Sequence, residues 1–93
     1  MTNFRRAKPD GAKMDGANLL KSDLSEASLR ETSLRKAYLG QAKLNGADLY
    51  KADLCGAYLS RADFTNANME IINLTKAVLC HTKTPQGVNN SNC

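Results

Sequence analysis

The sequence has few of the residues from which catalytic and metal sites are built. It contains one histidine, three cysteines and no tryptophan among 93 residues. Cys55, Cys80 and Cys93 form no CxxC pair, so they lack the spacing of a metal site. A catalytic triad would need a nucleophile and an acid around His81, which lies near the end of the chain. We therefore expect no enzymatic activity, no catalytic or metal-binding residue, no cofactor and no small-molecule substrate.

Long apolar runs and a strong charge of one sign are also lacking. No apolar stretch approaches the roughly 20 residues of a membrane-spanning helix, and no secretory signal opens the chain. The net charge is +4, with acidic residues interspersed among the basic ones from Asp10 onward. No nucleic-acid motif with interleaved aromatic residues occurs. We expect a cytoplasmic protein, or one that has lost a leader or a larger parent, with a protein rather than a nucleic acid as partner.

What the sequence does contain is a repeat of five residues that runs without insertion from Ala12 to His81. A repeat this regular takes precedence over other signals. Each unit has a small residue and, two places later, a large apolar one, beginning with Ala12 and Met14, although Ile72 takes the small position of its unit. We expect the large residues to stack as the core: Leu19, Leu24, Leu29, Leu34, Leu39, Leu44, Leu49, Leu54, Leu59, Phe64, Met69, Leu74 and Leu79.

A period of five excludes both regular secondary structures. On a helix, successive large residues would lie about 140° apart and leave no buried face. On a straight strand, an odd repeat would send them to opposite sides. The pattern therefore predicts a short extended piece and a corner in each unit, with the chain winding around an axis. Gly16, Gly46 and Gly56 end their units, where a corner can use positive φ.

Three units show the motif most clearly: ADLYK at 47–51, ADLCG at 52–56 and ADFTN at 62–66. They match A(D/N)LXX, and the chain resembles the pentapeptide-repeat proteins over about three quarters of its length. The ending TPQG at 84–87 with a final Cys93 is similar to the tails of some cyanobacterial members. The resemblance implies an all-β fold, a right-handed quadrilateral parallel β-helix (solenoid) of about four coils, with four units per coil.

The repeat divides the chain into three parts. Residues 1–11 keep the phase imperfectly, with Pro9 where a large residue would stand, and are a degraded first coil or an N-terminal cap. Residues 12–81 form the β-helix. Residues 82–93, where Pro85-Gln86-Gly87 favours a turn, form a C-terminal cap and tail.

With twenty residues per coil, as the resemblance implies, residues twenty apart stack. Asp23, Lys43, Asp63 and Lys83 then alternate in sign along one side. Another side becomes the most apolar outward surface, and we name it as a candidate interaction face carrying Leu20, Tyr38, Tyr58, Arg61 and Val78. Its tyrosines either only stabilise the stacking of coils or form a surface for a partner or a homodimer.

Three hypotheses for function remain open. The first is a non-enzymatic structural or protein-interaction module with a rigid surface. The second is a domain of a larger membrane or envelope protein. The third is a DNA-mimicking topoisomerase regulator, a role that some pentapeptide-repeat proteins have and that the resemblance therefore allows. Mimicry of a phosphate backbone needs a long, strongly negative rod, and the net charge of +4 argues against it.

A disulfide between Cys80 and Cys93 would fasten the tail over the end of the stack. Closing such a loop contributes roughly 3 kcal/mol in the entropy model. It would indicate an oxidising compartment, such as a periplasm or thylakoid lumen, whereas its absence would favour the cytoplasm. We expect thiol titration of the denatured protein to find only Cys55 before reduction and all three cysteines after it. Three free thiols before reduction would contradict the bridge.

Overall fold

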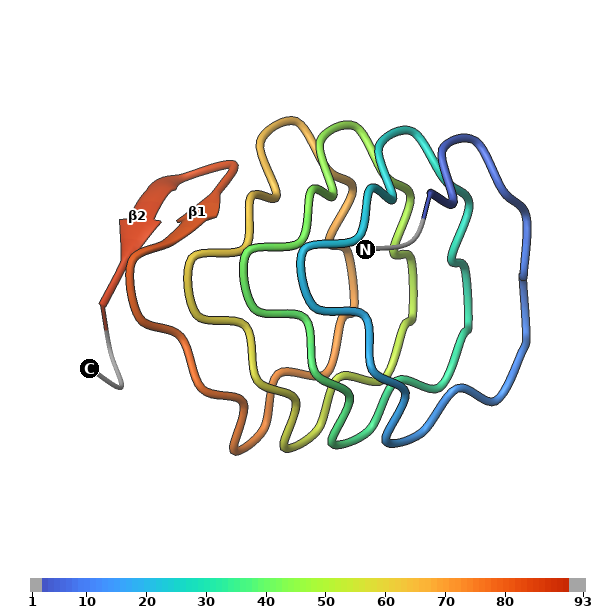
Figure 1. The fold of residues 1–93 in the computed structure, drawn as a ribbon, viewed down its shortest axis with the longest axis horizontal. Helices are drawn as coiled ribbons and strands as arrows, with labels where there is room; N and C mark the ends of the chain where they lie inside the picture. The colour runs from blue at the N-terminus through green and yellow to red at the C-terminus, as the bar shows by residue number, and fades with distance from the viewer. Residues whose placement is uncertain (1–2, 91–93) are drawn as a thin grey trace.

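The computed structural model describes residues 3–90, which wind into a stack of coils (Figure 1). Parallel bridges join residues twenty apart, as in the series Asn18, Tyr38, Tyr58 and Val78. The bridges run from Asn3 to Lys83, a span of 80 residues or four coils of twenty. The series that includes Asp23, Lys43, Asp63 and Lys83 is bridged in the same way. The bridges therefore show the twenty-residue register that the resemblance implies.

A turn with a left-handed residue separates each unit from the next. In the middle of the stack, the Ala42 N–H donates to the Leu39 carbonyl oxygen at 3.0 Å, which closes the turn. The residue just before the small one has positive φ at every fifth position from 6 to 81. Four of these sixteen positions are glycines, among them Gly46 with φ 68°, and twelve are not. The glycine corners predicted at 16, 46 and 56 are thus confirmed, but most corners use an L-residue in a costly conformation.

Regular strands occur only at the C-terminal end of the described chain. β1 (Thr82–Thr84) and β2 (Gly87–Asn89) form an antiparallel hairpin against the last coil (Figure 1). The turn predicted at 85–87 joins them, and the Thr84 hydroxyl donates to the Gly87 carbonyl oxygen at 2.8 Å. Within residues 3–81, except at Lys8, which has no bridge, each extended piece is a single bridged residue, because turns take up the rest of the five-residue unit. No helix occurs in the described range, so none there could span a membrane.

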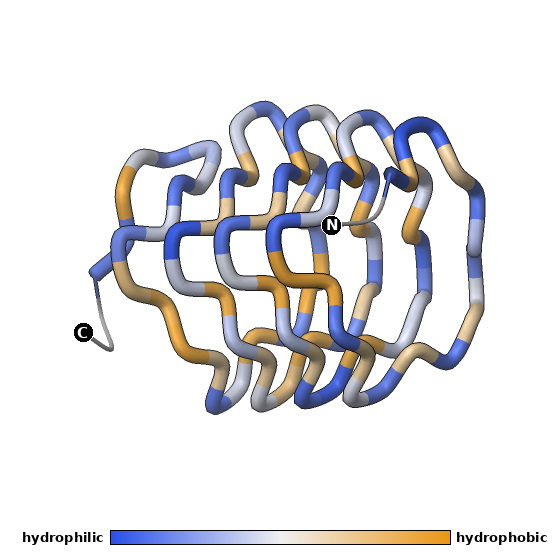
Figure 2. The backbone as a smooth tube through the Cα atoms, viewed as in Figure 1, coloured by the Kyte–Doolittle hydropathy of each residue, from blue (hydrophilic) through white to orange (hydrophobic). Residues whose placement is uncertain are grey.

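The large residues of the repeat fill the interior of the coils. From Leu24 to Phe64 their side chains are at most 1% exposed. Met69 and Leu74, also predicted as core, are only partly buried, because they lie in the last coil and lack a following one. Figure 2 shows hydrophobic segments recurring between hydrophilic corners along the tube. Two hydroxyls in small slots donate to the preceding coil, Thr82 Oγ1 to the Leu59 carbonyl oxygen at 2.7 Å and Thr32 Oγ1 to the Pro9 carbonyl oxygen at 3.2 Å. The buried Ser22 hydroxyl has no hydrogen-bond partner within residues 3–90.

The first coil follows the same path, but Pro9 interrupts its hydrogen bonds to the next coil. Phe4 and Met14 each donate an N–H to the next coil at 2.7 Å. Pro9 holds the equivalent position but has no N–H, so it cannot donate there. The neighbouring bond survives, because the Ser28 N–H donates to the Ala7 carbonyl oxygen at 2.8 Å. Residues 3–11 thus follow the path of the later coils, apart from the bond that Pro9 cannot make.

The corner at Ile71 offers a test of the left-handed conformation. Ile71 has φ 55° and is 69% exposed, and a β-branched residue in this region is a genuine outlier. We expect Ile71→Gly to stabilise the protein by up to about 1 kcal/mol, because the relieved strain exceeds the added freedom of the unfolded chain. Thermal unfolding would then shift upward by about 4 °C or more per kcal/mol.

Ile72→Gly is the matched control. Ile72 is partly buried against the core, so its replacement by glycine should lower the melting temperature. A fall of similar size for Ile71→Gly would contradict the assignment of strain to that corner.

Candidate interaction face

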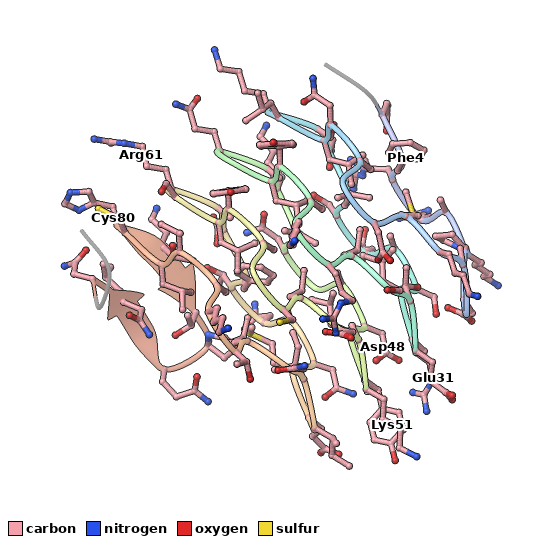
Figure 3. All side chains as sticks on the ribbon, turned by 90° about the horizontal axis from the view of Figure 1, so that it is seen from below. Phe4, Glu31, Asp48, Lys51, Arg61 and Cys80 are labelled. Atoms are coloured by element: carbon pink, nitrogen blue, oxygen red, sulfur yellow. The ribbon has the colours of Figure 1, made fainter. Side chains whose placement is uncertain are left out.

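Each side of the stack collects the outward side chains of units that lie twenty residues apart. One side, which we call the aromatic face, comes from the units at 17–21, 37–41, 57–61 and 77–81. Its outward residues are Asn18, Leu20, Lys21, Tyr38, Gly40, Gln41, Tyr58, Ser60, Arg61, Val78, Cys80 and His81. In Figure 3, Arg61 and Cys80 lie on this side, and Glu31, Asp48 and Lys51 lie on the opposite side of the stack.

Two stacked tyrosines dominate the aromatic face. The rings of Tyr38 and Tyr58 are parallel within 8°, with centroids 5.0 Å apart. That distance is close to the spacing of neighbouring coils, so the rings lie across the stack axis and turn their edges outward. Both remain exposed, at 45% and 44%. The coils beneath them are already closed by backbone hydrogen bonds, so the exposed ring surface is available for contact.

Leu20 extends the apolar part of this face. Its side chain is 50% exposed, and its Cδ2 lies 3.0 Å from the place that a Cβ on Gly40 would occupy. The missing side chain at Gly40 therefore leaves room for Leu20 to lie along the face. Val78 is half-buried above Tyr58, with which it shares a backbone bridge.

The charges of the aromatic face are all positive. The nine acidic residues of the sequence occupy the three other sides of the stack. Lys21 and Arg61 lie at corners along one edge of the face, and Lys36 and Lys76 lie at corners along the other edge. All four are exposed, and within residues 3–90 none of them takes part in an ion pair.

The carboxylates on two other sides are held by ladders of hydrogen bonds. Arg30 Nη1 donates to Asp48 Oδ2 at 2.9 Å, and Asn68 Nδ2 donates to Asp48 Oδ1 at 3.2 Å. Five residues on, the next side repeats this arrangement, because Arg35 Nη1 donates to Asp53 Oδ2 at 3.0 Å. These carboxylates thus have internal partners, in contrast with the cations that border the aromatic face.

The ladders favour the ionised form of both aspartates. Partial burial by itself raises the pKa of Asp48, but the Arg30 guanidinium, the Tyr50 N–H and the Asn68 amide together lower that pKa below its usual value. For Asp53, partial burial likewise raises the pKa, while the Cys55 N–H and the Arg35 guanidinium outweigh it and lower the pKa.

A surface hollow on the remaining side has mixed charge. It is lined by Arg5, Asp23, Glu26 and Lys43 among others, and Arg5 pairs with Glu26 at 3.2 Å. Among residues 3–90, no three histidine, cysteine or carboxylate side chains could hold a metal ion. The hollow therefore presents neither the apolar contact nor the single sign of charge seen on the aromatic face.

The register brings all five residues of the predicted face together, from Leu20 to Val78. Sequence reasoning missed Lys36 and Lys76 as the second basic edge, although their spacing of forty residues contained the signal. Cys55 is a free, half-buried cysteine. Cys93 lies outside the described residues, so its bridge to Cys80 stays a prediction.

The chain is similar to known repeat proteins. The family model for pentapeptide repeats matches in eight copies, at residues 2–30, 22–61, 32–70 and 57–83. A pentapeptide repeat protein from the thylakoid lumen of Arabidopsis thaliana is 34% identical with a TM-score of 0.77, over 80% of this chain and 51% of that one. HetL, a pentapeptide repeat protein involved in regulating heterocyst differentiation in the cyanobacterium Nostoc, is 28% identical with a TM-score of 0.50, over 91% and 41%. No curated protein matches the chain.

The lowered pKa values of Asp48 and Asp53 predict a loss of stability in acid. Since both folded-state values lie below the unfolded value of about 3.9, their contribution is complete above that pH and is lost as pH falls through the folded values. We expect urea midpoints of the wild type to fall from pH 5 towards pH 2. The variant Asp48→Asn with Asp53→Asn should start lower at pH 7 and change less. Parallel pH profiles for the two proteins would contradict this role of the ladders.

Proposed function

The chain belongs to the pentapeptide-repeat family, and from that membership and its surface we propose that it is a non-enzymatic structural or protein-interaction module. The observation that carries the proposal is the pair of exposed, stacked rings of Tyr38 and Tyr58, beside the half-exposed Leu20. These side chains lie outside a core that is complete without them. Contiguous exposed apolar surface bordered by polar residues is typical of a site that contacts another protein.

We also propose the finer description of the fold that the family implies. A turn every five residues and a bridge every twenty support a quadrilateral coil, and the parallel sense of the bridges supports a parallel β-helix. The right hand of the helix rests on the family resemblance.

We also propose a cellular compartment and a source organism for the protein. A Cys80–Cys93 bridge would place the protein in a periplasm or thylakoid lumen, and similarity to a lumenal protein of Arabidopsis supports the second. Without the bridge, the cytoplasm is proposed. The similarity to HetL of Nostoc supports a cyanobacterial origin.

The second candidate function is a part in a larger protein. The chain spans 51% of the length of the Arabidopsis protein and 41% of that of HetL. An additional coil stacked on the first would pair backbone groups there in the manner of the existing coils.

Two surface variants test the proposed role. Tyr38→Ser with Tyr58→Ser removes the ring pair without changing charge, and Tyr50→Ser removes a tyrosine from the opposite side as the control. Each immobilised protein is incubated with a lysate of the source organism. Proteins retained by the wild type and the Tyr50→Ser control should be lost from the double variant, provided that all three give the same circular dichroism. If all three retain the same proteins, the aromatic face is not an interaction site.

A further inference from the structure

We propose that the occupant of the aromatic face is an acidic, extended segment of another protein that lies along the stack axis. This inference rests on the proposed function, because it names the chemistry of the partner for that same face. It does not follow from family membership, which leaves the outward residues free to vary. It follows from how charge and aromatic rings are distributed on this particular surface.

The charge on the aromatic face is complementary to that of an acidic partner. The aromatic face carries no carboxylate, and Lys21, Arg61, Lys36 and Lys76 border its two edges. On the other sides, Arg30 and Arg35 form ion pairs with carboxylates of the same chain, at 2.9 and 3.0 Å. The four bordering cations make no such pair within residues 3–90. A partner with carboxylates would supply the missing counter-charges, whereas a basic partner would be repelled.

The orientation of the tyrosine rings also favours an anionic partner. Tyr38 and Tyr58 cover one face of each other at a centroid distance of 5.0 Å, so their edges and hydroxyl groups point outward. The edge of an aromatic ring carries partial positive charge, and a tyrosine hydroxyl can donate to a carboxylate. Both features favour an anion in the middle of the face as well as at its borders.

The same geometry argues against the other occupants. Single-stranded nucleic acid binds tyrosines by stacking bases on free ring faces, and here the tyrosine pair already covers one of the two faces of each ring. A second copy docked through the same face would set Lys21 and Arg61 of each chain near cations of the other. A face-to-face homodimer is therefore disfavoured by like charge.

Spacing supports an extended partner. Along each edge the cations lie forty residues apart, which is two coils. At the sheet spacing of about 4.8 Å per coil, their backbone positions are about 10 Å apart. A polyproline II segment rises about 3.1 Å per residue with three residues per turn, so every third side chain recurs on one side after about 9 Å. Carboxylates three residues apart would thus meet both cations of one edge.

A peptide titration tests the inference. The probe is a fluorescein-labelled peptide of three Glu-Pro-Pro units, and its neutral counterpart has glutamine in place of glutamate. We expect fluorescence anisotropy to show saturable binding of the glutamate peptide and no binding of the glutamine peptide. The affinity for the glutamate peptide should weaken severalfold between about 50 and about 300 mM salt, because salt screens the attraction between charges. Equal binding of the glutamine peptide would overturn the proposal.

Charge variants locate the site. Lys21→Glu with Arg61→Glu reverses one edge of the aromatic face and should weaken the glutamate peptide by about tenfold or more. Lys8→Glu with Lys51→Glu changes the net charge equally on the opposite side and should leave its affinity within about twofold. Equal weakening by both pairs would indicate a response to net charge alone, which contradicts the assigned site.

Two further probes examine the alternatives, a labelled oligothymidylate and vesicles containing phosphatidylserine. If either binds the wild type more tightly than the glutamate peptide does, the protein-segment assignment is wrong. Suppose that the glutamate peptide does not bind, but the double variant Tyr38→Ser with Tyr58→Ser still fails to retain proteins that the wild type retains. That result would refute the acidic occupant and would still support the proposed interaction module. If neither responds, the inference and the proposed function both fail.

Discussion

One left-handed residue in every five is the constraint on which the rest of the structure depends. At the sixteen corners from position 6 to position 81, the residue with positive φ comes two places after the large position of its unit and directly before the next small position. This conformation costs an L-residue about 1–2 kcal/mol, and twelve of the corners have a residue other than glycine. The conformation persists because the flanking residues are fixed from both sides, with large side chains buried in the interior and backbone groups bonded to neighbouring coils.

The corners also determine what the surface can do. Because they impose one path on every unit, the outward residues do not have to contribute to the core and can differ between sides. Two sides use this freedom for ladders centred on Asp48 and Asp53, which link successive coils. The aromatic face uses it differently, since its rings stack on each other and its bordering lysines and Arg61 stay unpaired within the described chain. The difference between linked sides and an open side is the physical basis of the proposed role.

Much of this could be predicted from the spacing of residues, and the remainder depends on atomic detail. A period of five predicted the buried set around Leu49 and the glycine corners, because burial and positive φ leave direct marks on composition. The corner at Ile71 left no such mark, since nothing in a β-branched residue indicates positive φ. The Arg30–Asp48 pair joins residues eighteen apart rather than twenty, so it depends on the reach of the arginine and not on the register. The two-strand hairpin at Thr82–Asn89 could be predicted only as a turn.

The central claim is that the chain folds only because each corner takes up a left-handed conformation. Chemical synthesis with D-glutamine at position 41, an exposed corner with φ 58°, tests it most directly, because a D-residue prefers the conformation that an L-residue resists. The account predicts a higher melting temperature than that of the all-L protein, and a lower one when D-alanine replaces the buried Ala42 instead. A D-glutamine variant destabilised as much as the D-alanine variant would contradict it.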